Sequence, residues 1–266
     1  MIYLKTEEEI ELLRKANLLV SATLTEIAKV VRPGVTTRQL DTLAEQFIRD
    51  HGAIPTFKGF PAGIEGADPF PASICTSVNN IVIHGIPDDT PLREGDIVSV
   101  DCGTLLDGFC GDSCYTFCVG EVSDEVKRLL RTTKESLYKG IEAATAGRRL
   151  GDIGFAVQQH CEAQGYGVVR EFVGHGIGHE MHEDPAVPNY GQRGSGKQLK
   201  NGLCIAIEPM ITSGSYEIAL MPDRWGVTTR DRMPAAHFEH TIAIHHGKAD
   251  ILSTFETIEA VEGKLY

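Results

Sequence analysis

Apolar residues recur at helical spacing in two segments near the start of the chain. In the first segment, Thr6 and Glu9 form a capping-box pattern, and the apolar positions that follow predict a helix ending before Pro33. In the second, apolar residues recur at steps of three and four between Thr37 and Gly52. The N-terminal region is therefore expected to contain two amphipathic helices.

Four apolar runs later in the chain predict β-strands, at residues 97–102, 109–119, 203–207 and 237–244. The pair Asp107-Gly108 joins the first two runs and is typical of a two-residue hairpin turn, which favours antiparallel pairing. Before these strands, residues 55–71 are too rich in Gly and Pro for regular structure. We expect that loop to line a site.

Residues 147–165 echo residues 34–52. Ile153 aligns with Leu40, and Gly165 aligns with Gly52, at the same offset along the chain. The echo suggests an internally duplicated α/β unit, in which a shared site would lie at the junction of the two copies. Chance similarity between two amphipathic helices is the alternative explanation.

Length and composition favour one globular α/β domain. A chain of 266 residues with 42% hydrophobic content can bury a full core without disulfides. We therefore expect a single catalytic domain over residues 1–266, with similar halves at approximately 1–125 and 126–266 around a mainly antiparallel sheet.

Charge and cysteine usage narrow the possible partners. The net charge of -12 argues against nucleic acid, which needs clustered Lys and Arg. No segment approaches the roughly 18 consecutive apolar residues that span a bilayer, so we expect no membrane partner. The seven cysteines form no C-x-x-C pair, and no signal peptide is evident, which favours a reducing, cytoplasmic setting.

Two aspartates lie where strands should be buried. Asp101 ends an apolar run, and a hairpin at Asp107-Gly108 would place it opposite Cys114. Asp112 would then be its diagonal neighbour on the same sheet face, about 7 to 8 Å away at Cα level. Two carboxylates on one buried face repel each other and need a cation between them. The alternative is that both are ordinary aspartates at strand ends or turns.

Three further residues have unusual surroundings. His175 lies between Gly174 and Gly176, which allow close backbone approach, although a histidine between glycines can also be a simple turn residue. Glu208 ends an apolar run before a proline, and Glu239 lies within a predicted strand. Each carboxylate occupies a position that ordinarily holds an apolar side chain.

These five residues together make a balanced donor set for two metal ions. Four carboxylates offset the charge of two divalent ions and leave room for a bridging hydroxide, as two-metal hydrolysis requires. Oxygen-rich ligation with one nitrogen and no thiolate favours Mn, Fe or Co over structural Zn, without excluding catalytic Zn. The sequence thus predicts a hydrolase with a dinuclear site.

Several other motifs do not support a function of their own. The histidines of His179-Glu180-Met181-His182 are too closely spaced for a zincin helix. Residues 191–197 fit a phosphate-loop pattern, but Gln198 replaces the Ser or Thr that would hold Mg²⁺. Alternating cysteines on the second predicted strand are expected to be small core residues rather than nucleophiles, namely Cys110, Cys114 and Cys118.

The combined motifs resemble type I methionine aminopeptidases of the M24 metallopeptidases. The resemblance rests on FVGHGIGHEMHEDPAVPNY at residues 172–190, the Asp101 and Asp112 pair, AIEPM around Glu208 and FEHT around Glu239. It implies the pita-bread fold, with two pseudo-symmetric halves around a central dinuclear metal site. It also implies hydrolytic removal of the N-terminal methionine from nascent proteins whose second residue is small.

The resemblance further implies a role for each ligand. Asp101 would chelate one ion, Asp112 and Glu239 would bridge both, and His175 with Glu208 would complete the second. The ions would be Co, Mn, Fe, Zn or Ni. Glu208 would also carry a proton from the attacking water to the leaving amine.

Two histidines and an apolar wall would receive the substrate. His84 and His182 match the histidines that orient the scissile peptide and stabilise its oxyanion, although His84 could instead only begin a turn. The methionine pocket would be lined by the same two histidines together with Cys75, Phe70, Met181 and Trp225. The stretch 59–68 is longer than expected, and Phe60 is a candidate for an aromatic wall position that has no clear counterpart.

Two alternatives stay open. Xaa-Pro aminopeptidases and prolidases use the same ligands but usually carry an N-terminal domain for which this chain lacks length, and non-catalytic binding proteins of this fold typically lose ligands. We further expect a monomer that acts on N-terminal peptide segments, with the ribosome as a further partner to consider.

Overall fold

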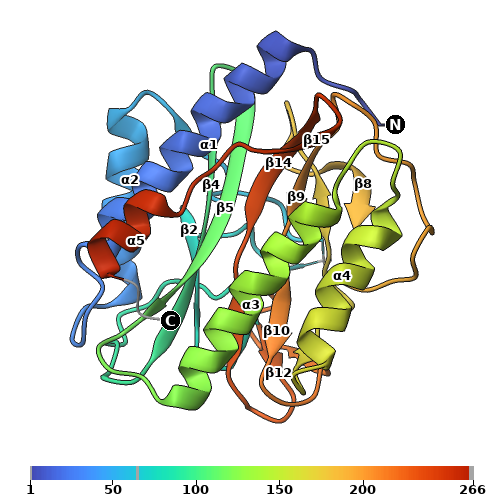
Figure 1. The fold of residues 1–266 in the computed structure, drawn as a ribbon. Helices are drawn as coiled ribbons and strands as arrows, with labels where there is room; N and C mark the ends of the chain where they lie inside the picture. Colours follow the sequence, from blue (N-terminus) through green and yellow to red (C-terminus); the bar gives the residue numbers. More distant parts are fainter. Residues whose placement is uncertain (1, 64–65, 264–266) are drawn as a thin grey trace.

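The computed structural model describes residues 2–63 and 66–263 (Figure 1). The predicted helices near residues 6, 37 and 150 are present as α1, α2 and α4, whereas α3 and α5 were not predicted. The described helices are α1 (Glu7–Ala28), α2 (Thr37–Asp50), α3 (Asp124–Ala143), α4 (Leu150–Glu162) and α5 (Glu256–Glu262).

The capping box at the start of α1 is confirmed. The Thr6 N–H donates to Glu9 Oε2 at 2.8 Å, and the Glu9 N–H donates to Thr6 Oγ1 at 3.3 Å. Helix α3 had comparable signals in the sequence, because the Ser123 hydroxyl accepts from the Val126 N–H and acidic residues fill the first turn. It could therefore have been found by the same criteria.

All strand pairs are antiparallel, as predicted. The sheet orders are β1-β4-β2 with β5 beside β4, β13-β10-β6, β11-β12-β3 and β15-β14-β9-β7-β8. The strands are β1 (Ile54–Pro55), β2 (Ile74–Val78), β3 (Ile81–Ile83), β4 (Ile97–Leu106), β5 (Phe109–Cys118), β6 (Gly167–Val168), β7 (Gly174–Gly176), β8 (Glu183–Val187), β9 (Cys204–Ile207), β10 (Met210–Thr212), β11 (Ile218–Leu220), β12 (Val227–Thr229), β13 (Ala235–His237), β14 (His240–His245) and β15 (Lys248–Ile251).

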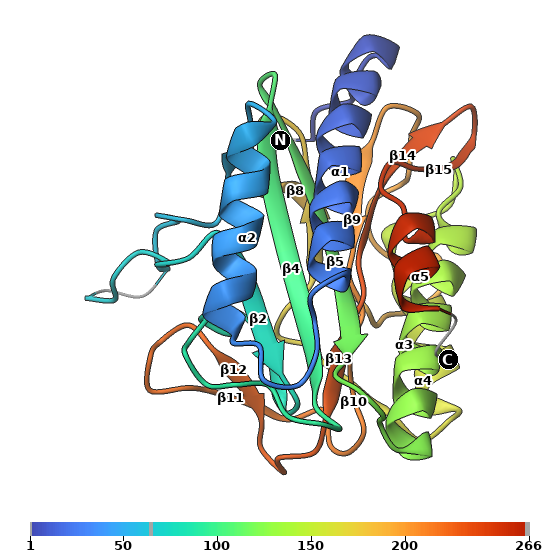
Figure 2. The ribbon, with the colours of Figure 1, turned by 90° about the vertical axis from the view of Figure 1, so that its left-hand side faces the viewer.

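Helices cover the strands from the outside. Helix α1 packs on β4 and β5, and α2 packs on β1 and β2, as the side view shows (Figure 2). Helix α3 packs on β9, β10 and β13, while α4 lies against β6 and β8. The echoing segments of the sequence fall on α2 and α4, and each of these helices follows a longer one. The division into two halves itself remains a prediction.

The β4–β5 hairpin has the predicted turn and register. Asp107 and Gly108 have φ values of 51° and 81°, which the left-handed turn requires. Asp101 pairs with Cys114, and Asp112 pairs with Gly103, two residues along the same strand pair. The two aspartates therefore lie on one face of the sheet, as the sequence predicted.

The predicted single strand at residues 237–244 is interrupted. It divides into β13 and β14, and Phe238 and Glu239 lie between them. At this break the Glu239 N–H donates to the Cys114 carbonyl at 2.9 Å, and the Ser113 hydroxyl donates to the Glu239 carbonyl at 2.6 Å. These bonds to β5 replace regular sheet pairing and hold Glu239 beside the hairpin.

The described part of the chain contains no helix long and apolar enough to span a membrane. All seven cysteines are free and buried. The three alternating cysteines of β5 are part of this buried set, in agreement with their predicted role as small core residues.

Helix α1 touches β5 so closely that one position has no room for a side chain. A Cβ added to Gly111 would lie 2.5 Å from the Ala16 carbonyl carbon in the backbone of α1. Because the obstacle is helix backbone, it cannot move aside without shifting the helix. Gly111 therefore sets the distance between α1 and the strand that carries Asp112.

We expect Gly111→Ala to lower the free energy of unfolding by about 1–3 kcal/mol, since overpacking forces backbone shifts. Urea denaturation measures this difference. Gly63→Ala is the control, because no atom lies within 4 Å of its added Cβ. Equal stability of Gly111→Ala and wild type would contradict the packing argument.

Candidate metal centre

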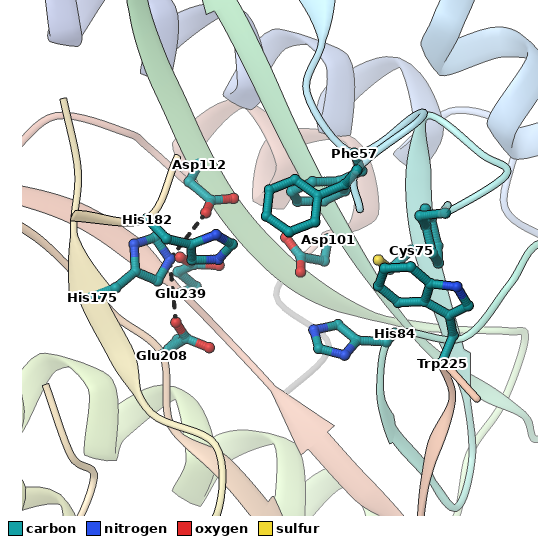
Figure 3. A pocket seen from close by; sticks show the side chains of 12 residues that line it. Phe57, Cys75, His84, Asp101, Asp112, His175, His182, Glu208, Trp225 and Glu239 are labelled. Carbon is teal, nitrogen blue, oxygen red and sulfur yellow. Dashed lines mark ion pairs between the residues drawn. The ribbon is translucent and has the colours of Figure 1, made fainter. Parts of the chain in front are cut away.

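A cavity of about 140 Å³ lies between the inner faces of the strands (Figure 3). One end is polar and the other is largely aromatic. Its lining contains all five predicted metal ligands and both predicted substrate histidines. The lining residues are Phe57, Phe60, Phe70, Cys75, His84, Asp101, Asp112, His175, His182, Glu208, Trp225 and Glu239.

The five candidate ligands come from separate elements. Asp101 and Asp112 lie on the β4–β5 hairpin, His175 lies on β7, Glu208 follows β9 and Glu239 lies between β13 and β14. Donor atoms of Asp112, His175 and Glu239 all lie within 4.8 Å of one another. The fold thus brings together residues that are far apart in the sequence.

His175 presents one ring nitrogen to the carboxylates. Its Nδ1 lies 2.9 Å from the Gly176 carbonyl oxygen, which can only accept a hydrogen bond, so Nδ1 carries the proton. The other nitrogen, Nε2, lies 3.5 Å from Asp112 Oδ2 and 3.6 Å from Glu208 Oε1. Burial lowers the pKa of His175, so its neutral form is favoured and Nε2 can bind a metal.

The glycines beside His175 are needed for close packing. A Cβ on Gly174 would lie 2.3 Å from the Ala206 carbonyl oxygen, and one on Gly176 would lie 2.2 Å from that of Asp184. Side chains at either position would push β7 away from its neighbours. The glycines beside His175 are therefore explained by close strand packing and not by a simple turn.

Burial makes these carboxylates costly to ionise in the protein alone. It raises the pKa of Asp112 to about 8 and is the largest cause of the high pKa values of Asp101, Glu208 and Glu239. Repulsion from neighbouring carboxylates raises the pKa of the latter three further.

The donor set fits divalent metal ions. Among the described residues, one buried oxygen of Asp101, one of Asp112 and one of Glu239 have no hydrogen-bond partner. Unpartnered buried oxygens are rare and call for a partner. Carboxylate oxygens with one neutral imidazole suit Mn, Fe, Co or catalytic Zn.

Three neutral histidines surround the carboxylates. His84 follows β3 with a φ of 57°, an uncommon conformation for a residue other than glycine. Burial, and then His182, lowers the pKa of His84 to about 4, and burial followed by His175 lowers that of His182 to about 4. His237, which the sequence analysis missed, places Nε2 3.8 Å from Glu208 Oε2. The proximity of His237 to Glu208 follows only from the register of the paired strands.

The apolar wall matches the predicted pocket in part. Phe70 and Trp225 meet edge to face with ring centroids 5.1 Å apart, and the Trp225 indole N–H donates to the Asp68 carbonyl at 2.9 Å. Phe60, the candidate wall residue, lies on the cavity with its ring 5.3 Å from that of His182. Phe57 was not predicted, although the loop that carries it was expected to line a site. Residues 64–65 of the 59–68 stretch lie outside the described residues.

Met181 does not line this cavity. It is 6% exposed and packs in a separate apolar cluster with Ile10 and Leu13 of α1. Its methyl carbon also fills the space where a Gly103 side chain would lie. The contact of Met181 with the hairpin, rather than with a ligand, accounts for its burial.

The family model described as metallopeptidase family M24 matches residues 11–246. The chain belongs to metallopeptidase family M24. The methionine aminopeptidase of Clostridium acetobutylicum is 50% identical over 257 residues, covering 96% of this chain and 100% of that protein. The crystal structure of methionine aminopeptidase from Rickettsia prowazekii matches with a TM-score of 0.92 and 43% identity, covering 96% of this chain and 100% of that one.

These matches confirm the predicted family resemblance and the pita-bread fold of the M24 family. Membership in a metallopeptidase family also implies bound metal ions, in agreement with the donor set. The Xaa-Pro dipeptidase from Bacillus anthracis shares the fold with a TM-score of 0.73 over 94% of this chain, but the sequence identity is only 22%. This chain covers 62% of that protein, so the likeness concerns the fold alone.

Metal removal is expected to make stability depend on pH in a defined direction. Because the folded metal-free protein holds a proton on Asp112 up to about pH 8, whereas the unfolded chain ionises near the ordinary value of 3.8, stability falls as pH rises between these values. Thermal unfolding in chelator at pH 5 and pH 8 measures the fall.

Asp112→Asn removes this titration, so its unfolding temperature in chelator should decline less between the two pH values. Saturating Mn²⁺ should raise the unfolding temperature of the wild type more than that of the variant. An identical decline in both proteins would show that Asp112 does not carry the effect.

Proposed function

We propose that this protein is a methionine aminopeptidase that hydrolyses the bond after an N-terminal methionine when the second residue is small. The observation that carries the proposal is a cavity with five candidate metal donors at one end and an aromatic wall at the other. A methionine side chain fits the wall while its peptide bond lies at the donors.

We propose that the donors hold two divalent ions. Asp101 would chelate one ion, Asp112 and Glu239 would bridge both, and His175 with Glu208 would complete the second. Such ions supply a water of lowered pKa and polarise the scissile carbonyl. The unpartnered oxygens and the lone pair on His175 Nε2 support this assignment.

Glu208 is proposed to move the proton. Its carboxylate lies at the boundary between the donor set and His237, with one oxygen 3.6 Å from His175 Nε2 and the other 3.8 Å from His237 Nε2. Burial raises its pKa, which brings the carboxyl closer to the range where it can accept and then release a proton. It would take the proton of the attacking water and deliver it to the leaving amine.

His84 and His182 are proposed to hold the reacting peptide. Both are neutral at neutral pH, so each can donate one hydrogen bond without adding a charge to the site. A donor aimed at the carbonyl oxygen strengthens its bond as negative charge develops there. The T-shaped contact between His175 and His182, with centroids 4.3 Å apart, fixes the second ring beside a ligand.

The apolar wall is proposed to select methionine. Phe70, Trp225 and the Cys75 thiol present a soft, polarisable surface to an unbranched thioether, which makes favourable contacts with aromatic edges. Phe57 and Phe60 extend this wall. The small cavity volume would exclude bulkier side chains.

The proposed substrates are the N-terminal segments of newly made proteins in the cytoplasm, and we propose residues 1–266 as one catalytic domain. A monomeric state and contact with the ribosome remain predictions. Xaa-Pro peptidase activity is the competing hypothesis, and a non-catalytic binding protein is the second.

Peptide hydrolysis separates these hypotheses. Met-Ala-Ser should lose its methionine when Mn²⁺ or Co²⁺ is added and should be stable in chelator, whereas Ala-Pro-Ala should be stable in both. Amino-acid release measured by chromatography provides the readout. Cleavage of the proline peptide alone would assign the chain to the competing activity, and no cleavage of either would favour a binding protein.

Replacing Glu208 by Gln should lower kcat for Met-Ala-Ser about 100-fold or more, because an amide cannot relay the proton. Steady-state kinetics at saturating Mn²⁺ measure the loss. Glu135→Gln is the control, since Glu135 is half exposed and pairs with His160 at the surface, away from the cavity. Wild-type kcat in Glu208→Gln would exclude the proposed relay.

A further inference from the structure

A second cluster of metal-binding side chains lies away from the cavity. It consists of Glu7, His245 and His246. Glu7 is in the first turn of α1, and the two histidines are at the tip of the β14–β15 hairpin. His246 and Gly247 form the turn with φ values of 48° and 82°.

The donor atoms of the three residues converge. One donor atom from each lies within 4.8 Å of the other two. His245 Nε2 is 3.7 Å from Glu7 Oε1, and the two imidazole rings lie with centroids 3.9 Å apart and planes tilted by 30°. Small side-chain rotations at these partly exposed positions would bring the three donors to one ion.

A neighbouring carboxylate holds His245 in a ligand orientation. Asp250 Oδ2 lies 3.5 Å from His245 Nδ1, and Arg14 donates to the same carboxylate oxygen at 2.7 Å. Metal-binding histidines commonly direct their second nitrogen at a carboxylate in this manner. The remaining nitrogen, His245 Nε2, is buried and has no hydrogen-bond partner within the described structure.

We propose that Glu7, His245 and His246 form a second metal site, which binds a divalent transition ion such as Ni²⁺, Cu²⁺ or Zn²⁺. Two imidazoles and one carboxylate suit these ions better than Mg²⁺ or Ca²⁺, which prefer oxygen ligands. Nearby Arg14 does not oppose the ion, because Glu11 and Asp250 already pair with it.

The site is separate from the cavity and would act on the fold. His245 is six positions after Glu239 along extended chain, which corresponds to about 20 Å. An ion bound here would connect the start of α1 to a hairpin near the end of the chain. It would therefore stabilise the folded protein independently of the catalytic ligands.

Counting bound metal in the full-length protein tests the proposal. Chelator-treated wild type is dialysed against Ni²⁺ and analysed for metal content, beside His245→Gln/His246→Gln, which should bind one ion fewer per chain. The control is His160→Gln, which disrupts another surface His–Glu pair, 3.1 Å apart, that has no second imidazole. The control should bind as many ions as the wild type.

Equal metal content in the double variant and the wild type would overturn the proposal, as would an equal loss in His160→Gln. A second measurement needs no variant. Once the cavity is saturated with metal, one further equivalent of Cu²⁺ should broaden the imidazole proton signals of His245 and His246 in the wild type, and signals that stay sharp at that point would also refute the site.

Discussion

The cost of burying four carboxylates together is the constraint around which this protein is organised. For Asp112, raising the pKa from 3.8 to about 8 corresponds to several kcal/mol of unfavourable free energy for the ionised form. Packing must outweigh such costs whenever no cation is bound. Helices on the outside of both strand layers provide that packing, and the aromatic wall closes the remaining space.

The hydrogen bonds around Asp112 show how the fold maintains this arrangement. Its N–H donates to Asn17 Oδ1 at 3.1 Å, and its carbonyl accepts from the Thr241 hydroxyl at 2.9 Å. Asn17 is itself held by a bond from its amide to the Leu13 carbonyl at 2.9 Å. Helix α1 and strand β14 thus fix the backbone of Asp112 from both sides.

Only some residues of this centre could be predicted from local sequence rules, and the reasons are physical. Asp101 and Asp112 could be placed by local rules, because a two-residue turn fixes the register of a hairpin. Glu208, Glu239 and His175 depend on pairing between distant segments, so only the resemblance to a family connected them. Phe57 and His237 were missed by the sequence analysis, because no periodicity marks a loop residue or a strand-end histidine as lying near a cavity. Met181 was assigned to the substrate pocket, but a buried methionine can equally well belong to an apolar core.

Glu239 follows Asp101 and Asp112 by more than a hundred positions, although all three side chains line one cavity. Chains emerge from the ribosome N-terminus first. The β4–β5 hairpin can therefore form with both aspartates in place while three of the five donors are still unmade. The five candidate donors can come together only after residue 239 has been synthesised and β14 has paired with β9. A metal ion held by all five candidate ligands could therefore bind only after this segment has joined the β4–β5 hairpin.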